Sequence, residues 1–278
     1  MMKKLLVLLL CLTLVVISFG ALYMDRDSDT NGSYVQLGDK TDYSWMHGSE
    51  NSLGFKWTIS CWIRVDAWPA SDYATVFASE AGATTQKGVV GMFSTTGTFF
   101  RSIDRGQSGT GILPGGFATL DVPLNGEWHH FAWTYDSTPA NGNSKIYIDG
   151  VLKDTGNKLG NGIAGDSSRY PCISAITDDL ATVTAGFDGA FDDYRIYKQY
   201  VFTQEDVLEV YGGRGNDGLV NHPRLYTRLM FQDKAEGVSV TNIIDSSSNG
   251  NDAVGATPSS ADLPKSVGSE LKFKKARN

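Results

Sequence analysis

The clearest alternation of apolar and polar positions lies in residues 126–135, which read GEWHHFAWTY. Even-numbered side chains from Trp128 to Thr134 point to one side of a predicted strand, and odd-numbered ones from His129 to Tyr135 point to the other. Both sets contain large rings. We therefore expect this strand to be covered on both faces.

Residues 145–153 predict a hairpin that follows this strand. Ile148 leads into Asp149-Gly150, a pair that tolerates the positive φ angles of a type I′ turn, and Val151 leads out of it. The strand, a polar loop and the hairpin together predict an antiparallel meander.

Further strands are predicted on either side of the meander. Residues 55–65 place five apolar side chains on one face: Trp57, Ile59, Cys61, Ile63 and Val65. Shorter strands are expected at residues 33–38, 73–79, 88–94, 99–103, 170–176 and 187–197. One helix is expected, capped by Thr203 and stopped by Gly212-Gly213. The pattern predicts an all-β protein with long loops, such as the glycine-rich segment 104–116.

Three of these segments resemble the laminin-G-like, concanavalin A-like jelly-roll domains, in the order in which that family has them. Residues 128–152 are similar to its central strand and hairpin, residues 55–63 to an early strand, and residues 187–197 to a late one. The resemblance covers residues 33–213 and implies one antiparallel jelly-roll β-sandwich with a short helix near its end. It implies little about function, because this fold carries many activities.

The C-terminal segment, residues 214–278, resembles the first strands of a second such domain. The similar stretches are residues 225–233, 245–253 and 268–273, and the domain that begins at Ser33 lacks this opening. Three interpretations stay open. The segment completes its own sandwich, it completes that of a neighbouring molecule, or it is a truncated remnant.

Residues 1–20 have the features of a cleaved secretory signal, with Lys3 and Lys4 before an apolar run. Residues 21–32 are expected to form a flexible lead-in. The chain has a net charge of −7, and loss of the two lysines makes it more negative. Nucleic acid is therefore not an expected partner, and no membrane insertion is expected after cleavage. We expect a secreted or cell-surface protein.

Two of the three cysteines, Cys61 and Cys172, remain after cleavage. In an oxidising compartment they allow one disulfide. The other interpretation is two buried thiols that pack as small apolar residues.

The sequence does not predict an enzyme. It lacks the closely spaced carboxylates (E-x-D-x-E) of glycosidases on the related fold, and it lacks G-x-S-x-G and H-E-x-x-H. His129 and His130 are adjacent and point to opposite faces, so they cannot hold one metal ion. A glycosidase with an unfamiliar site stays a third alternative.

Calcium is the one cofactor that the residues suggest. Asp245, Asn249, Asn251 and Asp252 lie in one polar turn and offer the oxygen ligands that this ion prefers. The other interpretation is that these side chains bond their own backbone in a turn.

Exposed rings near loops are candidates for stacking on a ligand. These are Tyr43, Trp45, Trp68, Tyr73 and Tyr170. We expect a non-enzymatic recognition module that binds a glycan or a surface protein. The alternative is a structural subunit of a filament, coat or virion surface that self-associates by exchange of its C-terminal strands.

Overall fold

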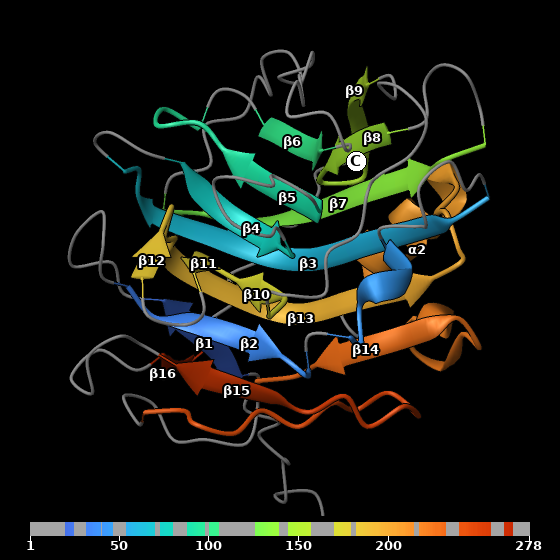
Figure 1. The fold of residues 1–278 in the computed structure, drawn as a ribbon. Helices are drawn as coiled ribbons and strands as arrows, with labels where there is room; N and C mark the ends of the chain where they lie inside the picture. Colours follow the sequence, from blue (N-terminus) through green and yellow to red (C-terminus); the bar gives the residue numbers. More distant parts are fainter. Residues whose placement is uncertain are drawn as a thin grey trace, which may run out of the picture.

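The fold is an antiparallel β-sandwich, shown by a computed structural model (Figure 1). The structure describes residues 20–24, 32–39, 41–46, 54–69, 73–79, 88–97, 100–105, 126–138, 144–156, 170–178, 182–213, 217–231, 239–256 and 264–268.

Two sheets account for most of the described strands. In the large sheet the order is β16-β1-β13-β3-β7-β8-β9, and β14 also pairs with β13. Its strands are β1 (Gly20–Met24), β3 (Lys56–Ala67), β7 (Trp128–Asp136), β8 (Ser144–Ile148), β9 (Val151–Gly156), β13 (Asp188–Lys198), β14 (Leu225–Leu229) and β16 (Lys265–Gly268).

In the small sheet the order is β15-β2-β10-β4-β5-β6. Its strands are β2 (Tyr34–Leu37), β4 (Ala74–Ala78), β5 (Gly88–Phe93), β6 (Phe100–Arg105), β10 (Cys172–Ile173) and β15 (Ala253–Ala256). Two short strands, β11 (Ile176–Asp178) and β12 (Thr182–Thr184), form a separate pair.

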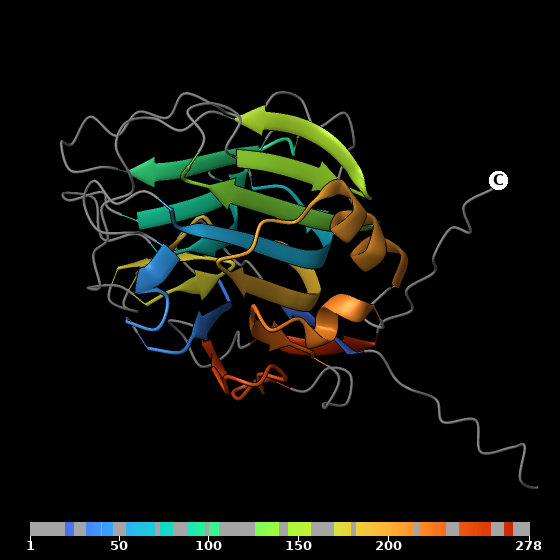
Figure 2. The same cartoon turned by 90° about the vertical axis from the view of Figure 1, so that its right-hand side faces the viewer.

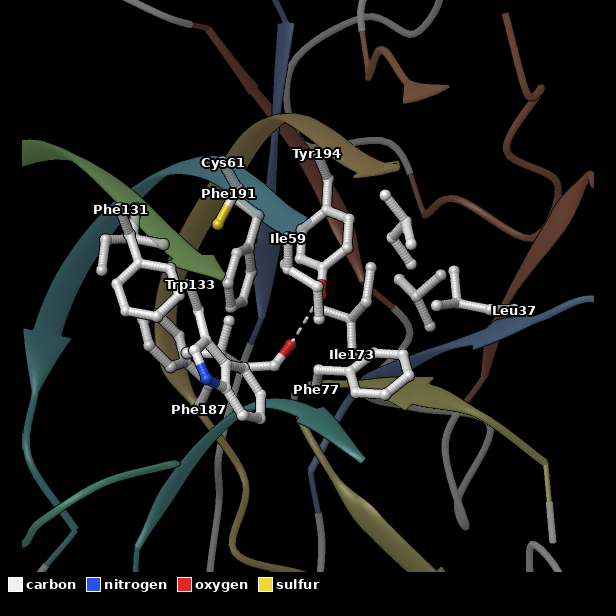
Figure 3. Packing of buried hydrophobic residues seen from close by; sticks show 14 of the residues in the cluster. Leu37, Ile59, Cys61, Phe77, Phe131, Trp133, Ile173, Phe187, Phe191 and Tyr194 are labelled. Carbon is white, nitrogen blue, oxygen red and sulfur yellow. Dashed lines mark hydrogen bonds between the residues drawn. The ribbon is translucent and has the colours of Figure 1, made fainter. Parts of the chain in front are cut away.

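The main core lies between the two sheets, and it contains the apolar face predicted for β3. Figure 3 shows side chains of the large sheet, such as Trp133 and Phe191, facing Phe77 and Ile173 of the small sheet. One polar link crosses the core, because the Tyr194 hydroxyl donates to the Val76 carbonyl at 3.2 Å. The two-residue period of the strands thus decides which side chains fill the sandwich.

The outer face of the large sheet is covered by helix α2 (Gln204–Gly213) and the 3-10 turn η2 (Gly218–Asn221) (Figure 2). This second cover explains why β7 carries large side chains on both faces. The predicted cap of α2 is confirmed. The Thr203 hydroxyl accepts from the Asp206 N–H at 3.2 Å, and the Asp206 carboxylate accepts from the Thr203 N–H at 2.8 Å.

The predicted hairpin between β8 and β9 is also confirmed. Ile148 pairs with Val151, and the two turn residues Asp149 and Gly150 have φ angles of 51° and 80°.

The expectation of a flexible lead-in at residues 21–32 is wrong for its first four residues. They belong to β1, which pairs with β13 on one side and β16 on the other. Ala21, Leu22 and Met24 are fully buried. The polar residues 25–31 and residues 1–19 of the proposed signal (1–20) lie outside the described residues, and Gly20, the last residue of that signal, begins β1. In the part of the chain that the structure describes, no helix is long and apolar enough to cross a membrane.

The C-terminal segment contributes strands to both sheets of its own chain. β14 pairs with β13, β15 with β2, and β16 with β1. In Figure 1 these orange and red strands lie along the bottom of the sandwich, next to the blue N-terminal strands. Residues at opposite ends of the sequence therefore share one core.

The candidate disulfide is contradicted, since Cys61 and Cys172 are free and buried thiols. Cys61 points into the main core from β3, where burial raises the pKa of its thiol. Cys172 belongs to a separate cluster with Tyr34 and Ala175. The two side chains therefore serve different packing layers.

Candidate functional site

The five rings proposed from the sequence do not form one site. Tyr43 and Trp45 lie side by side, with ring centroids 6.4 Å apart. Trp68 packs against Phe93 of β5, at 5.8 Å. Tyr73 and Tyr170 belong to two further apolar clusters, separate from the main core.

Tyr43 is not an exposed ligand-binding residue. It is 1% exposed and belongs to the core. Its hydroxyl lies 2.6 Å from the Thr227 hydroxyl, and burial raises the pKa of the phenol. The sequence placed it in a loop, but the short turn around it folds inward and the ring fills the interior.

Trp68, Tyr73 and Tyr170 are half-buried, and each packs on its own neighbours. Trp68 lies so close to Gly97 that a Cβ at that glycine would overlap the indole ring. Tyr73 packs on Met92 and its neighbours, and Tyr170 packs on the cluster around Tyr34. Each ring has a packing role of its own.

Trp45 lies in a cluster that the sequence did not reveal. Its ring meets that of Tyr226 edge to face, with centroids 5.1 Å apart. The Lys198 ammonium lies 5.2 Å from the Trp45 ring centre and 5.1 Å from that of Tyr226. All three side chains are half-buried. We call these three residues the aromatic–lysine cluster.

Three separate segments hold this cluster. Trp45 belongs to the 3-10 turn η1 (Ser44–Met46), Lys198 ends β13, and Tyr226 is the second residue of β14. In Figure 1 the blue turn lies in front of the neighbouring ends of the two strands. The Tyr226 hydroxyl donates to the Asp42 carbonyl at 2.7 Å, which ties the turn to β14.

Core packing beneath the cluster fixes the two rings. The buried ring of Tyr43 meets Tyr226 edge to face at 5.4 Å. Met46, next to Trp45, is fully buried. Since neighbouring rings and core anchors restrict the side chains, the aromatic surface is organised before any ligand arrives.

Tyr226 was missed because it belongs to the C-terminal segment, far from Trp45 in the sequence. A signal was present in the alternation of β14, where Leu225, Thr227 and Leu229 are buried and Tyr226 lies between them. That pattern predicts a half-exposed ring. It does not predict which other ring lies beside it.

The turn proposed for calcium uses its oxygens internally. The Asp245 carboxylate accepts N–H bonds from Arg228, Ser247 and Asn251, each at 2.8 Å. Asp252 accepts the N–H of Asp245 at 2.9 Å.

The side-chain amides of the same turn donate hydrogen bonds to the backbone of β14. The side chains of Asn249 and Asn251 donate to the Tyr226 carbonyl at 3.1 and 2.8 Å. These side chains thus anchor the turn to β14, in line with the alternative interpretation of a self-bonded turn, and calcium binding stays a prediction. Among the described residues, no group of three or more His, Cys, Asp or Glu side chains could hold a metal ion.

One hydroxyl–imidazole pair has the composition of a catalytic dyad. Ser60 Oγ lies 2.9 Å from His130 Nε2, but both residues are 0% exposed. Burial, followed by the nearby Arg195, lowers the pKa of His130 to about 4. His130 Nδ1 has no hydrogen-bond partner among the described atoms, so no carboxylate orients the ring as a triad requires. The neighbouring His129 instead pairs with Asp149 at 2.7 Å.

The two antiparallel sheets, packed on a shared aromatic core, define an all-β jelly-roll sandwich. The chain belongs to the concanavalin A-like lectin/glucanases superfamily, whose laminin-G family model matches residues 25–208. The resemblance inferred from the sequence is therefore confirmed. No curated protein matches the chain.

Solved structures with the same architecture share little sequence with the chain. One of them is a protein from Bacteroides ovatus whose assignment to carbohydrate binding is provisional. It is 15% identical to this chain, with a TM-score of 0.58. The match covers 91% of this chain and 60% of that one, so the chain spans about three fifths of its length.

Two further matches have lower TM-scores. The binding domain of botulinum neurotoxin DC, solved with rat synaptotagmin II, is 15% identical with a TM-score of 0.46, over 84% of this chain and 54% of that one. A heptameric pentraxin from Limulus polyphemus is 11% identical with a TM-score of 0.38, over 70% and 82%. At such identities the likeness concerns the fold.

Proposed function

We propose that this protein is a secreted or surface-exposed, non-enzymatic module that binds carbohydrate through the aromatic–lysine cluster. The observation that carries the proposal is the pair of half-buried rings of Trp45 and Tyr226, held edge to face by the core beneath them. Sugar rings present C–H faces that pack on aromatic rings, and their hydroxyls bond nearby polar groups.

Membership of a lectin and glucanase superfamily supports a binding role. The fold is shared with the Bacteroides ovatus protein assigned provisionally to carbohydrate binding. A recognition role is favoured over hydrolysis because the Ser60–His130 pair is fully buried. A surface protein stays the second ligand class, since a rigid aromatic pair also suits a protein hot spot.

The test is glycan-array screening of the purified protein, followed by calorimetric titration of any hit in calcium and in EDTA. We expect Trp45→Ala and Tyr226→Ala each to weaken binding at least about tenfold, because truncating an aromatic hot spot costs more than about 1.4 kcal/mol. Trp68→Ala is the matched control, since that indole is also half-buried but packs on Phe93.

Circular dichroism and unfolding midpoints check that each variant is folded, and Trp45→Leu replaces the alanine variant if that one unfolds. Equal binding by the wild type and by folded variants at Trp45 and Tyr226 would place the site elsewhere. Absence of any glycan hit would contradict a carbohydrate ligand.

A further inference from the structure

Two cationic residues, Lys198 and Arg224, are neighbours at the aromatic–lysine cluster. The backbone N–H of Lys198 donates to the Arg224 carbonyl at 2.8 Å, so Arg224, the residue before β14, lies beside the end of β13. The residues next to them, Tyr197 and Leu225, are register partners and both pack in the cluster on the outer face of the large sheet.

Neighbouring residues of an extended strand point to opposite faces, and residues opposite each other share a face. Lys198, which follows Tyr197 in β13, therefore points away from the outer cluster. The position of the Lys198 ammonium agrees with this direction, because it lies over the rings of Trp45 and Tyr226. Arg224 is exposed in the turn that precedes β14, and its backbone carbonyl bonds the backbone of Lys198.

Neither cation has a carboxylate partner in the part of the chain that the structure describes. Lys56 pairs with Asp136 at 2.9 Å and Arg64 pairs with Asp66 at 2.7 Å, whereas Lys145 and Lys153 have no salt bridge among the described residues. Among the described residues, Lys198 and Arg224 form no salt bridge. Two cationic residues without a described carboxylate partner thus lie next to the ring pair, in a chain with a net charge of −7.

Two carboxylates near the cluster must be weighed against them. The charge of Asp245 acts on Tyr226, but its carboxylate accepts backbone N–H groups of Arg228, Ser247 and Asn251. The second is Asp42. Its backbone carbonyl accepts the Tyr226 hydroxyl, and its carboxylate accepts the Asp39 N–H at 2.6 Å. The Asp42 carboxylate is therefore hydrogen-bonded within its own loop. It opposes an anion at the cluster but pairs with neither cation.

We infer that the cluster selects a sugar that carries an anionic group, a carboxylate or a sulfate. This inference rests on the proposed carbohydrate-binding function. The sugar ring packs on Trp45 and Tyr226, and its anion pairs with Lys198 and Arg224. Arg224 offers a planar fork of donors that fits an oxyanion, and Lys198 offers a compact charge on a long stem.

Lys198 covers the rings in the free protein, and its flexible stem lets it move with the arriving anion. The exchange is favourable because a charge-assisted hydrogen bond to an anion is stronger than an exposed cation–π contact. The lysine thus shields the rings when the site is empty and contributes to binding when it is filled.

The test compares three oligosaccharides of equal length by calorimetric titration: an oligogalacturonate, a sulfated galactose oligomer and a neutral galactose oligomer. We expect at least one anionic probe to bind ten times or more tightly than the neutral one, with affinity that falls as salt rises. Lys198→Met and Arg224→Met should each lower the ratio of anionic to neutral affinity several-fold. The two anionic probes separate carboxylate from sulfate.

Lys153→Met is the matched control, because this lysine lies on β9 at the opposite edge of the large sheet. Equal binding of neutral and anionic probes, both lost in Trp45→Ala, would overturn the anion preference and leave the carbohydrate function intact. Anionic binding that ignores Lys198 and Arg224 would also overturn it. Failure of all probes together with an empty glycan array would contradict the function itself.

Discussion

At the scale of single residues, the large sheet carries a buried charge network on β13. Arg195 is 0% exposed and donates to Asp193 at 2.9 Å and to Asp217 at 2.8 and 2.9 Å. Arg228 of β14 also donates to Asp193 at 2.9 Å. Burial works to raise the pKa of Asp193, but the two arginines outweigh it and hold that pKa below its ordinary value. The network joins β13, β14 and the cap of η2.

We predict that Arg195→Met destabilises the protein by about 3–5 kcal/mol, because it leaves two carboxylates buried without their main partner. Urea unfolding measures the change. Lys56→Met is the matched control, since the Lys56–Asp136 pair is partly exposed and should change stability by about 1 kcal/mol or less. Similar small effects in both variants would show that the network contributes little.

Two other buried groups respond to pH in opposite directions. Burial and then Arg195 lower the pKa of His130 to about 4, while Asp149, Asp193 and Asp217 act against the shift. Burial and then Asp193 raise the pKa of Asp192 to about 7, against the effect of both arginines. The unfolded chain should have ordinary values of about 6.5 and 3.8.

Between about pH 4 and 6.5 the unfolded chain binds a proton at His130 that the native protein does not. Stability from this group therefore rises with pH. Over about pH 4 to 7 the native protein keeps a proton on Asp192 that the unfolded chain has lost, so stability from that group falls as pH rises. The two contributions oppose each other in the wild type.

We predict that single variants separate these contributions. In Asp192→Asn, stability should rise from about pH 4 to 6.5, and in His130→Gln it should fall over about pH 4 to 7. Each slope should approach about 1.4 kcal/mol per pH unit. Denaturant unfolding at several pH values measures both, and parallel curves for the wild type and the variants would contradict the assignment.

At the scale of elements, the β8–β9 hairpin is fastened to helix α2. The Gln204 side chain donates to the Gly150 carbonyl at 2.6 Å. Gly150 has a φ of 80°, and a Cβ there would lie 2.9 Å from a Leu208 methyl carbon. Glycine is therefore favoured at position 150 for two reasons. Its backbone has a positive φ, and the packed helix leaves little room for a Cβ.

We predict that Gly150→Ala lowers stability by about 1–2 kcal/mol, from the cost of a positive φ and from contact with the helix. Gly212→Ala is the matched control, because that glycine lies in α2 and a Cβ there meets nothing within 4 Å. The control should be neutral or slightly stabilising. Thermal unfolding followed by circular dichroism compares the two, and equal midpoints would refute the steric argument.

At the scale of the whole molecule, the two ends of the sequence share one long strand edge. β1 pairs with Gly189 to Phe191 of β13, and β14 pairs with Tyr194 to Tyr197. The C-terminal segment also supplies Leu229, Ile243 and Ala253 to the main core. Without it, the edges of β13 and β2 would lose their partners, and exposed strand edges promote aggregation.

We predict that a chain ending at Gly213 is unfolded or aggregated. A chain ending at Gly268, which keeps every described strand, should behave as the full protein does. Light scattering after gel filtration and circular dichroism measure both. A folded monomer ending at Gly213 would refute the structural role of the segment. A full-length oligomer that depends on concentration and disappears on truncation would support strand exchange and the alternative structural function.

The sequence alone determined the central strands, the hairpin and the helix, because each depends on neighbours within a few residues. The short strands β1 and β12 were not predicted. Alternation fixed the face of Trp57 to Val65, Asp149-Gly150 fixed the turn, and Thr203 fixed the start of the helix. These local patterns also sufficed to identify the family. The C-terminal likeness to opening strands indicated that the chain carries them out of order.

The features that depend on contacts between residues far apart in the sequence appeared only in the tertiary structure. It buried Tyr43, kept the two cysteines apart, turned the oxygens of Asp245 inward, and placed Gly20 to Met24 in a sheet. The aromatic–lysine cluster joins residues from η1, β13 and β14, which are far apart in the chain. The alternation of apolar and polar residues predicts which side chains of one strand are exposed. It does not predict which residue of another segment lies beside them. The pairing of Trp45 with Tyr226 follows from the C-terminal strands closing the sandwich, and only the folded chain brings the two rings together.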